Sequence, residues 1–292
     1  MIAYEGTLFR PPSEANSLIL QATIGCSYNQ CTFCAMYREK RFRVRPMDEL
    51  LAEIEWARQS LGPVHKVFLA DGDALVAKAR FLAELCDVLR GAFPDLRRIS
   101  CYASPQSMAI RSVEEMSMLR EKGLTQYYLG IESGHDQVLS DLAKGVDAEE
   151  MIRVANKAHE AGVVLSTMIL LGAGGRQLSQ DHARESARVV NAIQPRFLST
   201  LVMTPVEGTP LGDQDAQGEV DELNPVELAA ELRELIVGLE CEATIFRSNH
   251  ASNTLTLAGV LPKDKPALLG ILDETLAHPS SARFVPRWRR GL

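Results

Sequence analysis

The chain has 292 residues, of which 46% are hydrophobic and 24% are charged, and its formal net charge is −7. This composition is that of an ordinary globular protein, and the length suits one large α/β domain or two small ones. The acidic balance argues against nucleic-acid binding over the whole surface. No apolar run approaches the ~20 residues of a membrane-spanning helix, and the first residues lack the pattern of a signal peptide. We therefore expect a cytoplasmic protein without membrane contact.

Short apolar runs alternate with helical patterns along the chain. Runs typical of buried strands begin near residues 18, 66, 98, 126, 163 and 197, and a helical pattern follows each one. Capping residues such as Ser112, Asp147 and Asn224 open several of the helices. Such alternation requires parallel strands joined by right-handed crossovers. Six units of this kind are too few for a closed eight-unit barrel.

Three cysteines lie close together directly after the first strand. Cys26, Cys31 and Cys34 have the spacing C-x4-C-x2-C. A structural zinc site is closed by four ligands, whereas three ligands leave a position open for a substrate or cofactor. Ligation by thiolates alone favours zinc or an iron–sulfur cluster. The other cysteines are scattered singly, and we expect them to be small buried residues: Cys86, Cys101 and Cys241.

The cysteine motif resembles that of the radical S-adenosylmethionine (radical SAM) superfamily. In that family, three cysteines after the first barrel strand hold a [4Fe–4S] cluster, and its fourth iron chelates S-adenosylmethionine. An aromatic residue before the third cysteine, here Phe33, is part of the pattern. The first gap holds four residues here, where three are common. The resemblance covers about residues 18 to 211 with specific motifs, and residues 246 to 265 more loosely.

The resemblance implies an α/β fold, a partial (β/α)6 TIM-like barrel. It divides the chain into an N-terminal extension (1–17), a radical SAM core (18–211) and a C-terminal helical extension closing the barrel (212–292). Ligands of parallel barrels bind at the carboxyl ends of the strands, so the residues that follow each predicted strand are the candidate site.

The turns after the second and third strands carry the first cofactor candidates. Asp71, Gly72 and Asp73 match by position a Gly-rich turn whose carbonyls receive the ammonium of S-adenosylmethionine in the family. The alternative is an acidic surface turn. Ser104 follows the third strand, where it could meet the carboxylate of the cofactor.

The later strands carry three further cofactor candidates. Glu132 lies in the sequence Gly-Ile-Glu-Ser-Gly and matches the acid that binds the ribose in the family; the alternative is an ion-paired acid of the barrel. Gly172 follows the fifth strand and would let the backbone approach adenine or substrate. Met203 follows the sixth strand, in a segment that is equally typical of a rigid closing turn.

Basic and polar segments provide candidates for substrate contact. The cationic strip from Arg38 to Arg45, and Arg43 in particular, would hold an anionic substrate, or would be a solvated strand face. A polar loop follows residue 245, and its side chains would contact substrate, close the barrel or form a buried polar plug under it: Arg247, Asn249, His250 and Asn253. The tail from Arg283 to Arg290 mixes cations with aromatic residues and reads as a flexible terminus or a nucleic-acid contact.

The implied function is that of a radical SAM enzyme. A reduced cluster would cleave S-adenosylmethionine to methionine and a 5′-deoxyadenosyl radical, which takes hydrogen from a substrate. Such an enzyme needs a one-electron reductant such as flavodoxin or ferredoxin. The sequence names neither a catalytic residue nor the substrate, and both a small molecule and a macromolecule, tRNA included, stay open. The alternative from another class is a zinc- or nucleic-acid-binding module without catalysis.

Overall fold

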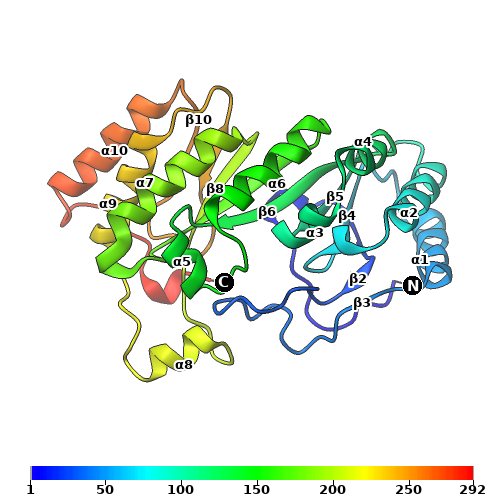
Figure 1. Ribbon diagram of the computed structural model, residues 1–292, viewed down its shortest axis with the longest axis horizontal. Helices are drawn as coiled ribbons and strands as arrows, with labels where there is room; N and C mark the ends of the chain where they lie inside the picture. Colours follow the sequence, from blue (N-terminus) through cyan, green and yellow to red (C-terminus); the bar gives the residue numbers. More distant parts are fainter. Residues whose placement is uncertain (1, 292) are drawn as a thin grey trace. The chain divides into compact units, whose positions relative to one another are not determined.

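The computed structural model of the protein describes residues 2–291. Its main sheet has eight strands in the order β1-β4-β5-β6-β7-β8-β9-β10, and β2 and β3 form a separate two-stranded sheet (Figure 1). The strands are β1 (Leu18–Gln21), β2 (Thr23–Ile24), β3 (Arg43–Val44), β4 (Lys66–Ala70), β5 (Arg98–Ala103), β6 (Leu124–Glu132), β7 (Val164–Leu171), β8 (Phe197–Val202), β9 (Ile245–Ser248) and β10 (Leu257–Val260).

A helix follows each of the long central strands. The α-helices are α1 (Met47–Ser60), α2 (Ala79–Ala92), α3 (Pro105–Ile110), α4 (Val113–Glu121), α5 (Asp136–Asp141), α6 (Ala148–Glu160), α7 (Gly175–Ile193), α8 (Pro210–Ala216), α9 (Pro225–Gly238) and α10 (Lys265–Ala277). Three short 3-10 helices complete the chain: η1 (Pro12–Glu14), η2 (Ala74–Val76) and η3 (Arg287–Arg289).

The predicted fold class is confirmed. The pairs β1–β4, β4–β5, β5–β6 and β7–β8 are all parallel. All the strands predicted from apolar runs are present, and each starts within two residues of its expected position. Parallel neighbours need a crossover connection, and the helices between the strands provide it.

The predicted capping residues explain where several helices begin. The Ser112 hydroxyl accepts from the N–H of Glu115, and the Asn224 side chain accepts from the N–H of Glu227. In both helices the glutamate side chain accepts in return from the N–H of the capping residue, so the capping box is complete. Such caps contribute about 1 kcal/mol each.

The C-terminal extension differs from the prediction, because it contains strands as well as helices. β9 continues the sheet parallel to β8, and β10 pairs antiparallel with β9. Phe246 and Ser248 of β9 are buried while Arg247 between them is exposed, which is the alternation of a strand with one buried face. The sequence hides this alternation because the strand is short and its buried positions include a serine.

The chain forms two compact units. The first contains the residues up to Asn29, Met36–Leu129 and Val154–Leu165. The second contains Gln30–Ala35, Gly130–Arg153 and the chain from Ser166 onward. Large buried side chains fill both cores, including Phe68 and Tyr127 in the first unit and Phe246 in the second. Burying an aromatic or aliphatic side chain of this size contributes about 1.5–3 kcal/mol.

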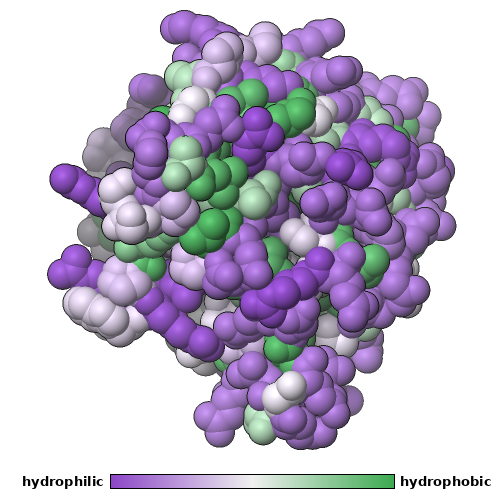
Figure 2. Space-filling view, turned by 90° about the vertical axis from the view of Figure 1, so that its left-hand side faces the viewer, coloured by the Kyte–Doolittle hydropathy of each residue, from purple (hydrophilic) through white to green (hydrophobic). Residues whose placement is uncertain are grey.

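In the second unit, α9 packs against both α7 and α10, and the three helices lie together in Figure 1. The face shown in Figure 2 is mostly hydrophilic, with several separate hydrophobic patches, one of which lies left of the centre. Between residues 2 and 291, no helix combines the length and the apolar character that crossing a membrane requires.

Candidate active site

The cysteine loop leaves β2 and returns at β3, which pairs antiparallel with β2. Gly25 opens the loop with a φ of +77°, a conformation that glycine adopts readily and other residues rarely do. Its N–H donates to Asp71 Oδ2 at 3.1 Å, and its carbonyl accepts from the N–H of Gly72 at 3.1 Å. The start of the loop is therefore fastened to the turn after β4.

The motif cysteines differ from the others in exposure. The three in the loop are partly exposed, while the remaining three are buried: Cys86, Cys101 and Cys241. Burial raises the pKa of the Cys86 thiol to about 12 and that of Cys101 well above its usual range. Because the thiolate is the form that binds metal, these two cysteines are poor ligands. The prediction that they are inert buried residues agrees with the structure.

Asp71 is fully buried at the turn after β4 and is already engaged within the first unit. Its Oδ2 accepts from Lys40 Nζ at 2.8 Å as well as from the N–H of Gly25. Its Oδ1 has no hydrogen-bond partner among the described residues. Asp71 thus holds the cysteine loop in place through Oδ2. Its Oδ1, in the residue next to Gly72, can still accept a hydrogen bond.

Asp73 is likewise buried and joins three segments of the first unit. It accepts hydrogen bonds from Ser27 Oγ at 2.5 Å and from Ser104 Oγ at 2.7 Å. Ser104 also caps α3, because its hydroxyl accepts from the N–H of Ser107. Burial raises the pKa of Asp73, and the serine hydrogen bonds oppose that shift. Asp73 and Ser104 therefore bind each other and the cysteine loop.

Gly72 lies between these two carboxylates and is pressed against the cysteine loop. A Cβ added to it would come within 2.6 Å of the Tyr37 ring and 2.9 Å of Cys26 Cβ. Contacts that short do not occur between real side chains, so any other residue would push the loop away. The backbone of the turn is thus held directly beside Cys26.

Glu132 ends β6 and folds back over its own strand in the second unit. Its φ is +66°, an unusual conformation for a residue with a side chain, which costs of the order of 1 kcal/mol. Its Oε1 accepts from Lys144 Nζ at 2.9 Å, and both side chains are buried. A Cβ on Gly130 would lie 1.9 Å from the same oxygen. Glycine at 130 is therefore what makes room for this carboxylate.

Lys144 places a positive charge close to two of the motif cysteines. Burial, the largest influence, lowers its pKa, but the Glu132 carboxylate and the Cys31 and Cys34 thiolates together raise the pKa above its ordinary value. The ammonium group therefore stays charged. A buried cation beside thiolates stabilises their deprotonated form.

The predicted site residues are distributed over both units. The first unit holds Cys26, Asp71, Gly72, Asp73 and Ser104; the second holds Cys31, Phe33, Cys34, Glu132, Gly172 and Met203. Phe33 is partly buried in the loop. Within residues 2–291, no three His, Cys, Asp or Glu side chains are grouped closely enough to form a metal site.

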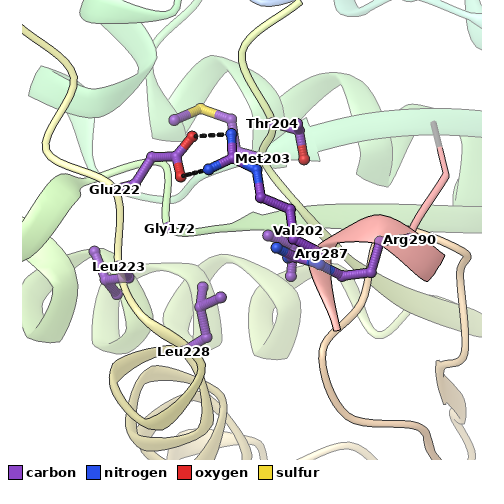
Figure 3. A pocket seen from close by; sticks show the side chains of 9 residues that line it. All are labelled: Gly172, Val202, Met203, Thr204, Glu222, Leu223, Leu228, Arg287 and Arg290. Carbon is purple, nitrogen blue, oxygen red and sulfur yellow. Dashed lines mark hydrogen bonds and ion pairs between the residues drawn. The ribbon is translucent and has the colours of Figure 1, made fainter. Parts of the chain in front are cut away.

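Gly172 and Met203 line one small cavity of about 30 Å³ at the carboxyl ends of β7 and β8 (Figure 3). Gly172 has a φ of +82°, and its N–H donates to the buried carboxyl group of Glu231 at 2.6 Å. Burial raises the pKa of Glu231 to about 7, against the opposing effect of its hydrogen bonds from Ser179 and Gly172. Two arginines of the C-terminal tail line the same cavity, Arg287 and Arg290.

The polar loop after β9 is largely occupied with the sheet itself. Asn253 is buried; its Oδ1 accepts from the N–H of Val202, and its amide donates to Thr200 O at 2.7 Å. These bonds tie the loop to β8. His250 contacts Ser252, and Asn249 and Arg247 are exposed.

Several cations of the strip from Arg38 to Arg45 form ion pairs with carboxylates of the first unit. Lys40 binds Asp71, as described above, and the buried Arg45 donates to both carboxylate oxygens of Glu53 at 2.9 and 3.0 Å. Arg43 forms an exposed ion pair with Glu5. The strip therefore fastens segments of the first unit together, and Arg43 is the member whose pair is accessible to solvent.

Sequence reasoning did not identify Lys144 or Glu231, and it did not connect the tail arginines with the cavity at Gly172. Lys144 carries only a weak signal: it is a single lysine that stands ten residues after the Gly-Ile-Glu-Ser-Gly motif, directly before Gly145. Glu231 carries no such signal in the sequence, because it stands in an amphipathic helical pattern as a surface glutamate would. Its position behind Gly172 depends on how α9 packs.

Comparison with known proteins identifies the family. The model of the Radical SAM superfamily matches residues 20–183, which is more than half of the chain. Biotin synthase of Natronomonas pharaonis is 26% identical over 110 residues, which are 38% of this chain and 29% of that protein. The tRNA-2-methylthio-N(6)-dimethylallyladenosine synthase of Marinomonas sp. is 25% identical over 210 residues, which are 68% of this chain and 45% of that protein. The chain thus spans less than half the length of these relatives.

Solved structures show the same fold at low identity. Coproporphyrinogen III oxidase (HemN) from Escherichia coli, a radical SAM enzyme, has a TM-score of 0.59 at 18% identity, over 76% of this chain and 51% of that one. Methylornithine synthase (PylB) has a TM-score of 0.54 at 19% identity, over 76% and 63% of the two chains. By its sequence match and its fold, the chain belongs to the radical SAM superfamily of enzymes, which use a [4Fe–4S] cluster and S-adenosylmethionine.

Proposed function

We propose that the protein cleaves S-adenosylmethionine reductively at a [4Fe–4S] cluster held by Cys26, Cys31 and Cys34. The observation that carries this proposal is the loop itself: its three cysteines are partly exposed, while the other cysteines of the chain are buried. When bound, the cluster and cofactor supply a 5′-deoxyadenosyl radical that removes hydrogen from a substrate. The chain supplies ligands, orientation and exclusion of water.

The donor chemistry of the loop fits such a cluster. Thiolates are the ligands of iron–sulfur clusters, and three of them leave one iron open for a cofactor. Lys144 faces the thiolates of Cys31 and Cys34 with a positive charge, which offsets part of the negative charge that a thiolate-bound cluster adds. Gly72 has no side chain, so its backbone packs directly against the Tyr37 ring and Cys26.

We assign the cofactor contacts to the turn at Gly72, to Phe33, to Glu132 and to the segments at Gly172 and Met203. Asp71 and Asp73 enter this assignment through the turn that they brace, because their carboxylates hold the cysteine loop and Ser104. Glu132 has one oxygen on Lys144 and keeps its second oxygen for a ribose hydroxyl. These roles support binding and orientation; no group of the chain is assigned as an acid or base.

Anaerobic reconstitution with iron and sulfide tests the proposal. We expect a brown protein with about four irons per chain that yields 5′-deoxyadenosine and methionine when it is reduced in the presence of S-adenosylmethionine. Cys26→Ala, Cys31→Ala and Cys34→Ala should each lose the cluster, while Cys86→Ala serves as the matched control and should retain it. A colourless protein that binds zinc would instead support the non-catalytic alternative.

The reaction on the substrate lies beyond the cleavage step. One distant relative is a tRNA-2-methylthio-N(6)-dimethylallyladenosine synthase and another is a biotin synthase. The two names imply different substrates, so we assign neither substrate to this chain. A one-electron reductant of the flavodoxin or ferredoxin class is part of the proposal, because the cleavage consumes an electron.

A further inference from the structure

The C-terminal tail is docked, not loose. The N–H of Val285 donates to Thr254 O at 2.8 Å, and the N–H of Gly291 donates to Ala251 O at 3.1 Å. Between these two anchors, η3 carries its arginines across the end of β8. Figure 3 shows Arg290 reaching toward Val202, the last residue of that strand. The flexible terminus expected from the sequence is therefore fixed against the second unit.

The cavity under the tail has more positive than negative charge. Arg287 pairs with Glu222 through two contacts of 3.2 and 3.3 Å; the Arg287 side chain is 68% exposed to solvent and the Glu222 side chain 35%. Arg290 lines the same cavity, and no carboxylate among the described residues forms an ion pair with it. Two guanidinium groups thus share one carboxylate, which leaves a net charge of about +1.

Arg290 also has an unused donor that water does not reach. Its Nε is buried and has no hydrogen-bond partner within residues 2–291. Burial, and then the charge of Arg287, lower the pKa of Arg290, but a guanidinium still keeps its proton at neutral pH. A buried donor on a charged group without a partner is costly, so an oxyanion oxygen that reached this atom would remove that cost.

The place and size of the cavity restrict what would bind. It lies at the carboxyl ends of parallel strands, where ligands of such folds bind, and Gly172 lines it together with Met203. A cavity of about 30 Å³ has room for one or two waters or for one small charged group. Guanidinium groups bind carboxylate and phosphate oxygens in a bidentate, planar manner.

We propose that Arg290, with Arg287, forms a receptor for an oxyanion group of the substrate, a carboxylate or a phosphate. The exposed pair with Glu222 is weak, as surface ion pairs are, so Arg287 can turn from Glu222 to the entering anion while Arg290 donates from Nε. The assignment of this anion to the substrate rests on the proposed function; the binding of the anion itself does not.

The tail provides its own reporter and its own control. The chain has two tryptophans, Trp56 and Trp288, so Trp56→Phe leaves Trp288 of η3 as the single reporter. Arg289 is exposed, stacks on Trp288 with its guanidinium 4.8 Å from the ring centroid, and is not among the residues lining the cavity. Arg289→Gln therefore removes the same charge from the same turn as Arg290→Gln, without touching the cavity.

The test titrates the full-length reconstituted protein in the Trp56→Phe background with acetate, succinate and inorganic phosphate at constant ionic strength. We expect saturable binding in the millimolar range, weakened about tenfold or more by Arg290→Gln and less than about twofold by Arg289→Gln. Preference for the carboxylates or for phosphate would identify the source of the oxyanion. Equal weakening by the two variants, or no saturable binding, would overturn the proposal.

A second measurement separates substrate from cofactor. Arg290→Gln should leave the Kd for S-adenosylmethionine and the substrate-free cleavage rate unchanged. If this variant instead weakens S-adenosylmethionine binding about tenfold, the arginine receives the cofactor's carboxylate and the substrate assignment is wrong. Absence of cleavage in the unmutated protein would count against the proposed function alone, because anion binding is measured without cleavage.

Discussion

Removing either member of the buried Glu132–Lys144 pair should destabilise the protein, and removing both should cost much less than the sum. At 2.9 Å and an effective dielectric constant of about 20, the Coulomb attraction of such a pair is about 6 kcal/mol before desolvation. Desolvation offsets part of this attraction, and the measured cost of breaking a buried pair is about 3–5 kcal/mol. We expect values in that range for Lys144→Met, and somewhat lower values for Glu132→Gln, which keeps one acceptor oxygen.

Urea unfolding of the cluster-free protein, followed by circular dichroism, measures these costs without interference from loss of iron. The double variant should show a coupling energy of about 2 kcal/mol or more. Glu150→Gln is the matched control, because Glu150 pairs with Arg153 on an exposed helix face and should cost less than about 1 kcal/mol. Additive single costs, or costs no larger than the control, would refute the buried pair.

The same variants report on the cofactor. Glu132→Gln should retain its iron and bind S-adenosylmethionine about ten- to hundredfold more weakly, because the charged acceptor is lost. Lys144→Met should lower the midpoint potential of the cluster, since a cation beside the thiolates favours the reduced state. An unchanged Kd with activity abolished would instead make Glu132 a group that takes part in the chemistry.

Three further predictions concern single residues. Gly130→Ala should cost several kcal/mol, of the order of breaking the pair itself, because its Cβ would lie 1.9 Å from Glu132 Oε1, whereas Gly91→Ala, with nothing within 4 Å, should be neutral or stabilising in thermal unfolding. Burial raises the pKa of Glu231 to about 7 and lowers that of His182 to about 4, so the glutamate makes the protein less stable as pH rises from about 4.5 to 7, while the histidine makes it more stable from about 4 to 6.5. The two slopes nearly cancel, and Glu231→Gln should reveal a rise of about 3 kcal/mol between pH 4 and 6.5; a flat profile in that variant would contradict the opposing titrations. Arg45→Gln should cost about 3–5 kcal/mol in urea unfolding, while Arg43→Gln should cost less than about 1 kcal/mol, and similar costs for both would show that burial does not distinguish the two pairs.

The local chemistry of the chain was readable from the sequence. The strands at residues 18, 66 and 98, the capping boxes at Ser112 and Asn224, and the cysteine motif all depend on neighbours a few positions apart. The motif and the strand count together pointed to the family that the comparison with known proteins then showed.

Only the tertiary structure decided how the charged side chains pair. Lys144 meets Glu132, Lys40 meets Asp71, and Glu231 lies behind Gly172. Each of these partners is brought together by a fold that joins residues 12 to 59 positions apart, and burial then makes the pairing strong. The tertiary structure likewise decided the positions of β9 and of the C-terminal tail. β9 forms its hydrogen bonds with β8, and the tail forms one with Ala251, so neither segment is fixed by neighbours in its own sequence. Sequence patterns record local periodicity, whereas these contacts depend on which side chains the folded chain removes from water.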